Sequence, residues 1–175
     1  MLRAAVLAAL AALAVLAGCA HDPDKQAGPK TSTALDRRIT PRTKLPAALL
    51  PLLPRNGVYV AGGGLVSSAW RVVLDLDART LYGGSAAASN ASSLGPMDKE
   101  ATKDLSQRNQ ELLMGLANAA WNEPPSKERP DPTADYDEIF IVLEGDNTFF
   151  LEGFGPIRQP AAVKAIVELR AAAGL

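Results

Sequence analysis

Apolar and polar residues alternate along two stretches of the chain in the way that half-buried strands require. In the first, "SAWRVVLDLD" (68–77), one face carries Trp70, Val72, Leu74 and Leu76. A short strand "GVYVA" (57–61) precedes it and "TLYGG" (80–84) follows it across a turn. The second stretch, "EIFIVL" (138–143), predicts the first strand of another hairpin, which turns at 145–147 and returns over 148–152.

A period near 3.6 residues predicts two helices. The first would have Asp98 as its N-cap and run to about Trp121. The second would begin at Pro160, where the missing N–H is tolerated, and end at Gly174. The expected apolar stripes are Leu105, Leu112, Leu113, Leu116, Ala117 and Ala120 in the first helix, and Val163, Ile166 and Val167 in the second.

These elements predict an α+β fold. Hairpins separated by helices favour an antiparallel sheet of four to five strands, built from two hairpins, with two helices packed on one face. The glycines at 62–64 lack the residues of a phosphate-binding loop or a dinucleotide site, so we expect them to form a turn or bulge.

The chain before residue 57 follows a different pattern. Arg3 is followed by a run of alanine, leucine and valine over 4–17, which is the layout of an export signal. A membrane-spanning helix needs about 20 apolar residues, and His21 and Asp22 close this run earlier. An export signal is therefore favoured over a permanent transmembrane anchor.

The run ends in Leu16-Ala17-Gly18-Cys19, which resembles the lipobox of bacterial lipoproteins over roughly the first 20 residues. The resemblance implies a diacylglyceryl group on the Cys19 sulfur and cleavage after Gly18. The new amino group would often be acylated as well, and more than one acyl chain makes the attachment durable. Ala20 stands where an aspartate can retain such proteins at the inner membrane, so the resemblance implies the periplasmic face of the outer membrane. The alternative is an ordinary secretory signal with an incidental cysteine.

We therefore expect three parts: a lipoprotein signal peptide over 1–18, a proline-rich tether and N-terminal arm over 19–56, and a single α+β domain over 57–175. The start of the tether, "HDPDKQAGPKTST" (21–33), is too polar to fold alone. The later "LPAALLPLLP" (45–54) is more apolar. Leu49 to Leu53 would either pack onto the domain or form an adhesive strip for a partner or the bilayer surface.

Composition narrows the possible chemistry. After removal of 1–18, 17 basic residues face 19 acidic ones, so nothing indicates nucleic-acid binding. Cys19 is the only cysteine and His21 the only histidine. An acylated Cys19 leaves no disulfide, no Ser-His-Asp triad in the domain and no metal site built on imidazole and thiolate. We predict neither a cofactor nor a metal.

Carboxylates remain as candidate catalytic groups. Asp75 and Asp77 share one face of a strand, and Asp135, Asp137 and Glu138 begin the second hairpin. Two such groups about 5 to 10 Å apart can hydrolyse a glycosidic bond when one is held protonated. The alternative is that they face water or start turns.

The favoured function is a membrane-anchored envelope lipoprotein that acts as a non-catalytic binding or structural accessory module, without a predicted catalytic residue. Its sheet edge, loops or arm would bind an envelope protein. The alternatives are a carboxylate-dependent glycan hydrolase of the cell envelope, and a carrier of a small apolar ligand, which needs a cavity of a few hundred Å³ between sheet and helices.

Overall fold

A computed structural model of the chain describes residues 39–64, 68–87, 92–124, 136–154 and 156–175. All of these lie in one unit, Thr33–Leu175. Its elements are the strands β1 (Ile39–Pro41), β2 (Asn56–Gly64), β3 (Ala69–Asp75), β4 (Thr80–Ala86), β5 (Lys99–Asp104), β6 (Tyr136–Glu144) and β7 (Asn147–Phe154), and the helices α2 (Gln107–Asn122) and α3 (Pro160–Ala173).

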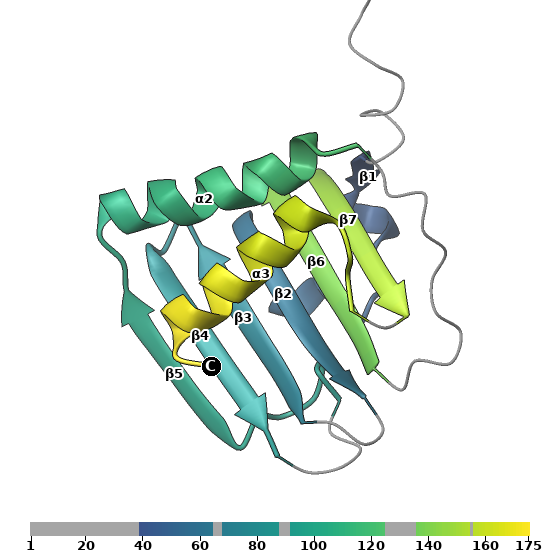
Figure 1. Cartoon of the computed structure of the whole chain (residues 1–175), viewed down its shortest axis with the longest axis vertical. Coiled ribbons are helices and arrows are strands. Elements are labelled where there is room, and N and C mark those ends of the chain that lie inside the picture. The colour runs from purple at the N-terminus through teal and green to yellow at the C-terminus, as the bar shows by residue number, and fades with distance from the viewer. Residues whose placement is uncertain (1–38, 65–67, 88–91, 125–135, 155) are drawn as a thin grey trace, which may run out of the picture. The chain divides into compact units, whose positions relative to one another are not determined.

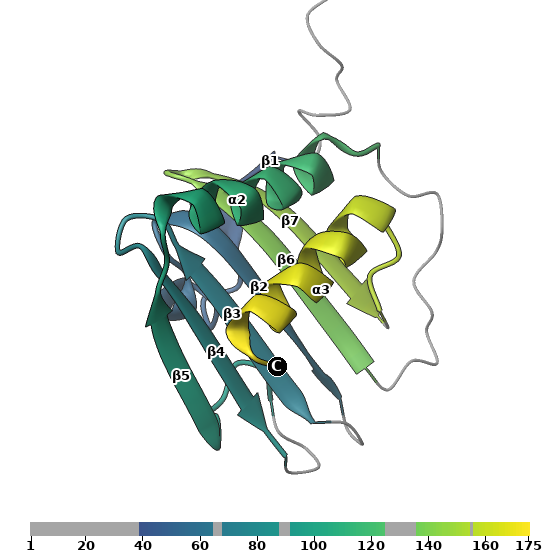
Figure 2. The same cartoon turned by 60° about the vertical axis from the view of Figure 1, so that its left-hand side comes forward.

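The strands form one antiparallel sheet in the order β1-β7-β6-β2-β3-β4-β5 (Figure 1). The two expected hairpins are present as β3–β4 and β6–β7. They meet through β2, which pairs with β3 on one side and with β6 on the other. The α+β class and the two helices are therefore confirmed, and both helices lie across the same face of the sheet (Figure 2).

Alternation along the central strands sends apolar side chains to both faces of the sheet. On the helix face, Val58, Val72 and Phe140 belong to a core that includes Leu113 of α2 and Leu169 of α3. The two helices therefore bury the helix face of the central strands.

A segment that follows β1 covers the other face, which we call the arm face. Leu45, Leu49 and Leu53 are buried there against Tyr59 and Ile141. The segment is also held by hydrogen bonds: the guanidinium of Arg42 donates to the carbonyls of Pro54, at 2.7 Å, and Leu53, at 3.0 Å. Of the two alternatives for Leu49 to Leu53, the structure shows packing onto the sheet.

The strand number expected from the sequence is wrong, because the described part of the chain forms a sheet of seven strands and not four to five. The two unexpected strands are the edges. β5, "KEATKD", has all six side chains exposed, so it carries no apolar alternation to reveal it. β1 is three residues long and ends in Pro41, and short edge strands with proline are common because one side of the strand needs no partner.

The expected start of the first helix is also wrong. Asp98 does not cap a helix; its carboxylate accepts a hydrogen bond from the backbone N–H of Ala87, and β5 follows it. Ser106 is the N-cap of α2, and its hydroxyl accepts from the N–H of Asn109. The end of α3 at Gly174 agrees with the sequence, since Gly174 has a φ of 86° there.

The apolar stripe of α3 differs from expectation, and that of α2 is narrower than expected. In α3 the buried residues are Ala162, Ala165, Ile166 and Leu169, whereas Val163 and Val167 are exposed. Small residues face the sheet because the helix lies very close to it: a Cβ built on Gly83 of β4 would be 2.9 Å from the Cβ of Ala173. In α2, Leu112 is exposed while Leu113, Ala117 and Ala120 are buried.

Candidate binding site

A pocket of about 370 Å³ lies between α2, α3 and β5, and we call it the wedge. It exists because the two helices diverge across the sheet (Figure 1). Where they lie close together, the carboxylate of Glu123 at the end of α2 accepts a hydrogen bond from the N–H of Ala161 in α3. The lining residues are Lys103, Asp104, Leu105, Asn109, Leu112, Leu113, Glu168 and Ala172.

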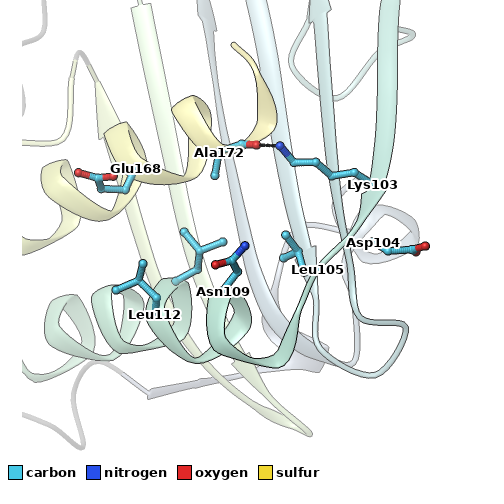
Figure 3. Close-up of a pocket in the computed structure, with 8 residues that line it drawn as sticks. Lys103, Asp104, Leu105, Asn109, Leu112, Glu168 and Ala172 are labelled. Atoms are coloured by element: carbon cyan, nitrogen blue, oxygen red, sulfur yellow. Dashed lines mark hydrogen bonds between the residues drawn. The ribbon is translucent and has the colours of Figure 1, made fainter.

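The wedge combines an apolar wall with polar groups. Leu105, Asn109 and Leu112 point toward the space between the helices (Figure 3). Leu112, which lines the wedge, is 64% exposed. An exposed apolar side chain in the wall of a pocket is available to contact a ligand.

Lys103 joins β5 to the end of α3. Its Nζ donates a hydrogen bond to the carbonyl of Ala172, one of the last backbone acceptors of the helix (Figure 3). A cation at this position is favourable because the carbonyl end of a helix carries partial negative charge. The lysine therefore links β5 to the end of α3 at the open end of the wedge.

The lining favours a protein ligand over an enclosed lipid. Five of the eight lining residues are exposed: Lys103, Asp104, Asn109, Leu112 and Glu168. The volume suits a small ligand, but a site for an apolar molecule would bury most of that molecule's surface. An open wedge with charges of both signs at its edge suits side chains projecting from another protein.

β5 borders the wedge and forms an edge of the sheet. Among the described residues it pairs only with β4. The backbone N–H of Leu105 donates to the carbonyl of Arg79, in the register of this ladder. Since hydrogen-bonded residues alternate along an antiparallel strand, Glu100, Thr102 and Asp104 direct their backbone N–H and C=O groups away from β4.

A buried polar cluster lies on the helix face. The indole N–H of Trp70 donates to the hydroxyl of Tyr136 at 2.7 Å, and that hydroxyl donates to the carboxylate of Glu138 at 3.2 Å. Glu138 is only 8% exposed, and its second oxygen accepts from the N–H of Ile157 at 2.7 Å. Arg170 lies over the Trp70 ring, with 4.4 Å from Cζ to the ring centroid. The cluster holds the segment before α3, and α3 itself, against the sheet.

The register explains how this cluster fits. Gly62 of β2 lies directly between Trp70 on β3 and Glu138 on β6. A Cβ at Gly62 would be 2.6 Å from the Tyr136 hydroxyl and 2.7 Å from the Trp70 ring. The expected turn or bulge at 62–64 is therefore wrong, because β2 continues to Gly64 and Gly62 serves to leave space.

A second polar cluster lies on the arm face. The guanidinium of Arg71 donates to the Tyr82 hydroxyl at 3.2 Å, and that hydroxyl donates to Glu100 at 2.9 Å. The hydroxyl of Tyr59 is buried and makes no hydrogen bond of normal geometry within the described residues. Burial raises the pKa of Tyr59 to about 12, and the charge of the nearby Arg71 offsets this only in part.

The candidate catalytic carboxylates are not brought together. The carboxylate of Asp75 accepts from the N–H of Ala78 in a turn, and Asp77 accepts from the side chain of Asn56. Asp75 and Asp137 share the arm face, but they pair with Gly57 and Gly63 of β2. Six residues along a strand separate these positions by about 20 Å, which exceeds the spacing that glycoside hydrolysis requires.

The remaining candidates do not complete such a pair. Glu138 faces the helices, on the opposite side of the sheet from Asp75, and is held by Tyr136 and Ile157. Asp135 lies outside the described residues. The structure thus gives no support to a glycan hydrolase built on these groups.

The residues at the N-terminus that carry the lipobox resemblance, Leu16 to Cys19, lie outside the described residues, as does His21. Within the described ranges, no helix has the length and hydropathy needed to cross a membrane. In the same ranges, no three histidine, cysteine, aspartate or glutamate side chains are grouped as metal ligands would be.

Comparisons of the chain with protein-family models, with curated proteins and with solved structures found no match.

Sequence reasoning missed the wedge. The signal available was the exposed Leu112, which stands beside Leu113 and makes the apolar stripe of α2 wider than the core needs. Lys103 and Asp104 could not be recognised as lining residues, because β5 was expected to be the first part of a helix.

Proposed function

We propose that this protein is a lipid-anchored accessory protein of the bacterial cell envelope, which binds another envelope component and catalyses no reaction. The anchor would be the acylated Cys19, and the protein would lie at the periplasmic face of the outer membrane. The observation that carries the binding role is the open wedge between α2 and α3, with the exposed Leu112 in its wall.

The geometry favours binding over the two alternatives. A glycan hydrolase built on the two hairpins needs a carboxylate of each close together, and Asp75 is about 20 Å along the sheet from Asp137 and on the opposite face from Glu138. A carrier needs an enclosure for its apolar ligand, and the wedge is lined mostly by exposed residues. A protein partner can use Leu112 as an apolar contact and the charged residues around it for orientation.

Cross-linking in cells tests the binding role. A photoreactive amino acid would replace Leu112 in the full-length protein, and a matched control would replace Ala119, which is exposed on the same helix but does not line the wedge. We expect a discrete adduct with one protein from position 112 and none from position 119. Diffuse adducts of equal intensity from both positions would contradict the proposal.

The anchor is tested separately. In Cys19→Ser the lipid attachment is removed, so the protein should leave the membrane fraction and should no longer incorporate labelled fatty acid. Wild-type protein recovered in the soluble periplasmic fraction with a free thiol at Cys19 would show that the anchor does not exist.

A further inference from the structure

We propose that the free edge of β5 binds an extended segment of a partner protein, whose acidic side chains lie on the helix face and whose basic side chains lie on the arm face. This deepens the proposed function, on which it rests, by naming the kind of partner. The partner strand would extend the sheet beside the wedge.

The backbone of β5 is available for such pairing. Its six side chains are all exposed, and it pairs with β4 alone among the described strands. Glu100, Thr102 and Asp104 present their N–H and C=O groups away from β4. An added strand would satisfy these groups with backbone hydrogen bonds, which give affinity without a sequence motif.

The charges of β5 are sorted by face. Lys99 and Lys103 alternate with Glu100 and Asp104 along the strand. Lys103 reaches α3, so the lysines lie on the helix face. Glu100 bonds to Tyr82, which bonds to Arg71 on the arm face, so the acids lie on that side. One face of the edge is therefore basic and the other acidic.

This sorting opposes pairing between two copies of β5. Consider a second copy of β5 that pairs antiparallel with the first across a two-fold axis. If Ala101 of one copy lies opposite Ala101 of the other, Lys99 lies opposite Lys103. If Thr102 lies opposite Thr102, Glu100 lies opposite Asp104. Like charges directly opposite each other destabilise a ladder, and charged edge strands commonly prevent self-association in this way.

A partner strand whose charges are arranged in the opposite way would form attractive charge pairs with β5, where a second copy of β5 would form repulsive ones. Acidic residues opposite Lys99 and Lys103, together with basic residues opposite Glu100 and Asp104, give four favourable cross-strand pairs. Discrimination between partners would come from this attraction and from the repulsion against strands of the wrong pattern.

Two fusions test the edge directly. Each carries a six-residue segment attached to Leu175 of the full lipidated chain, in detergent, by a flexible glycine-serine linker. The end of α3 lies beside β5, as the Lys103–Ala172 hydrogen bond shows, so the linker can be short and the effective concentration of the segment high. The first segment, Lys-Glu-Thr-Val-Lys-Glu, matches β5 in antiparallel pairing. The second, Glu-Lys-Thr-Val-Glu-Lys, has the same composition and opposes like charges in the same register.

Amide hydrogen exchange measured by NMR gives the readout. The first segment should slow exchange at Glu100, Thr102 and Asp104 at least tenfold, and the second should not. Exchanging the charges in Lys99→Glu/Glu100→Lys/Lys103→Glu/Asp104→Lys should reverse the preference. Protection by neither segment, or by both equally, would overturn the proposal.

The result is separable from that of the cross-linking experiment. A discrete adduct at Leu112 with no charge preference at β5 would leave the binding role standing and remove the edge as its site. Charge-selective protection at β5 with no adduct at Leu112 would support the edge as a binding site and remove the wedge.

Discussion

Replacing Leu49 by alanine tests whether the segment after β1 is a structural part of the fold. Leu49 is 1% exposed and lies on the arm face with Leu45, Leu53, Tyr59 and Ile141. In Leu49→Ala the side chain is cut back while the helix face, α2 and α3 remain untouched. The matched control is Leu52→Ala, in the same segment at a partly exposed position.

The expected loss follows from burial. Leucine-to-alanine substitutions in a closed core cost about 2 to 5 kcal/mol, depending on how far the site collapses. The tight cluster around Leu49 places the expected loss of unfolding free energy at about 3 kcal/mol. The control should lose no more than about 1 kcal/mol, because Leu52 is already in contact with water. For a chain of this size, 3 kcal/mol corresponds to a fall in Tm of about 10 °C.

Urea unfolding of the chain with Cys19→Ser, followed by circular dichroism, measures both variants without a lipid. The midpoint should fall strongly for Leu49→Ala with an unchanged slope, since the surface exposed on unfolding stays nearly the same. If the two variants lost equal and small amounts of stability, the segment would not be docked on the sheet, and the core of the arm face would be refuted.

Further predictions concern single residues. Gly62→Ala should cost about 2 kcal/mol of stability by urea unfolding, because its Cβ would meet Tyr136 and Trp70. The control is Gly115→Ala at an exposed helical position with nothing within 4 Å, which should gain about 0.5 to 1 kcal/mol. Equal effects of the two substitutions would contradict the packing around Gly62. Since the pKa of Tyr59 is raised to about 12 by burial, the folded state holds the proton more tightly than the unfolded state, and this contribution to stability is present below pH 10 and lost between about pH 10 and 12. Tyr59→Phe should flatten that loss, because phenylalanine has no proton to release; an unchanged pH dependence would count against the assignment. Ala20→Asp should move the lipidated protein to the inner-membrane fraction on a density gradient, and wild-type protein already banding there would contradict the outer-membrane location.

The hairpins were predictable because apolar side chains alternate regularly along their strands. Trp70, Val72 and Leu74 alternate with residues of the other face, and Ile139, Ile141 and Leu143 do the same in β6. A half-buried or buried strand must place apolar side chains with a period of two, and this requirement is local. The same holds for Pro160 and Gly174, whose backbone preferences mark the two ends of α3.

The edges of the sheet were not predictable in this way. β5 contains lysine, glutamate, alanine and aspartate, which favour strands poorly, and its place in the sheet depends on pairing with β4. β1 pairs with β7 through residues more than a hundred positions away. Such pairing is decided by the whole fold, because the strand itself buries little.

By itself, the sequence determined the α+β class, the two hairpins, the lipobox resemblance and the scarcity of catalytic groups. Each depends on residue types at short spacing. Only the tertiary structure decided that Asp75 and Asp137 are far apart, that Leu112 faces an open wedge, and that β5 is an edge of the sheet among the described strands, with its charges sorted by face. These depend on how distant segments meet, which the pairing of β2 with β6 and the divergence of the two helices determine.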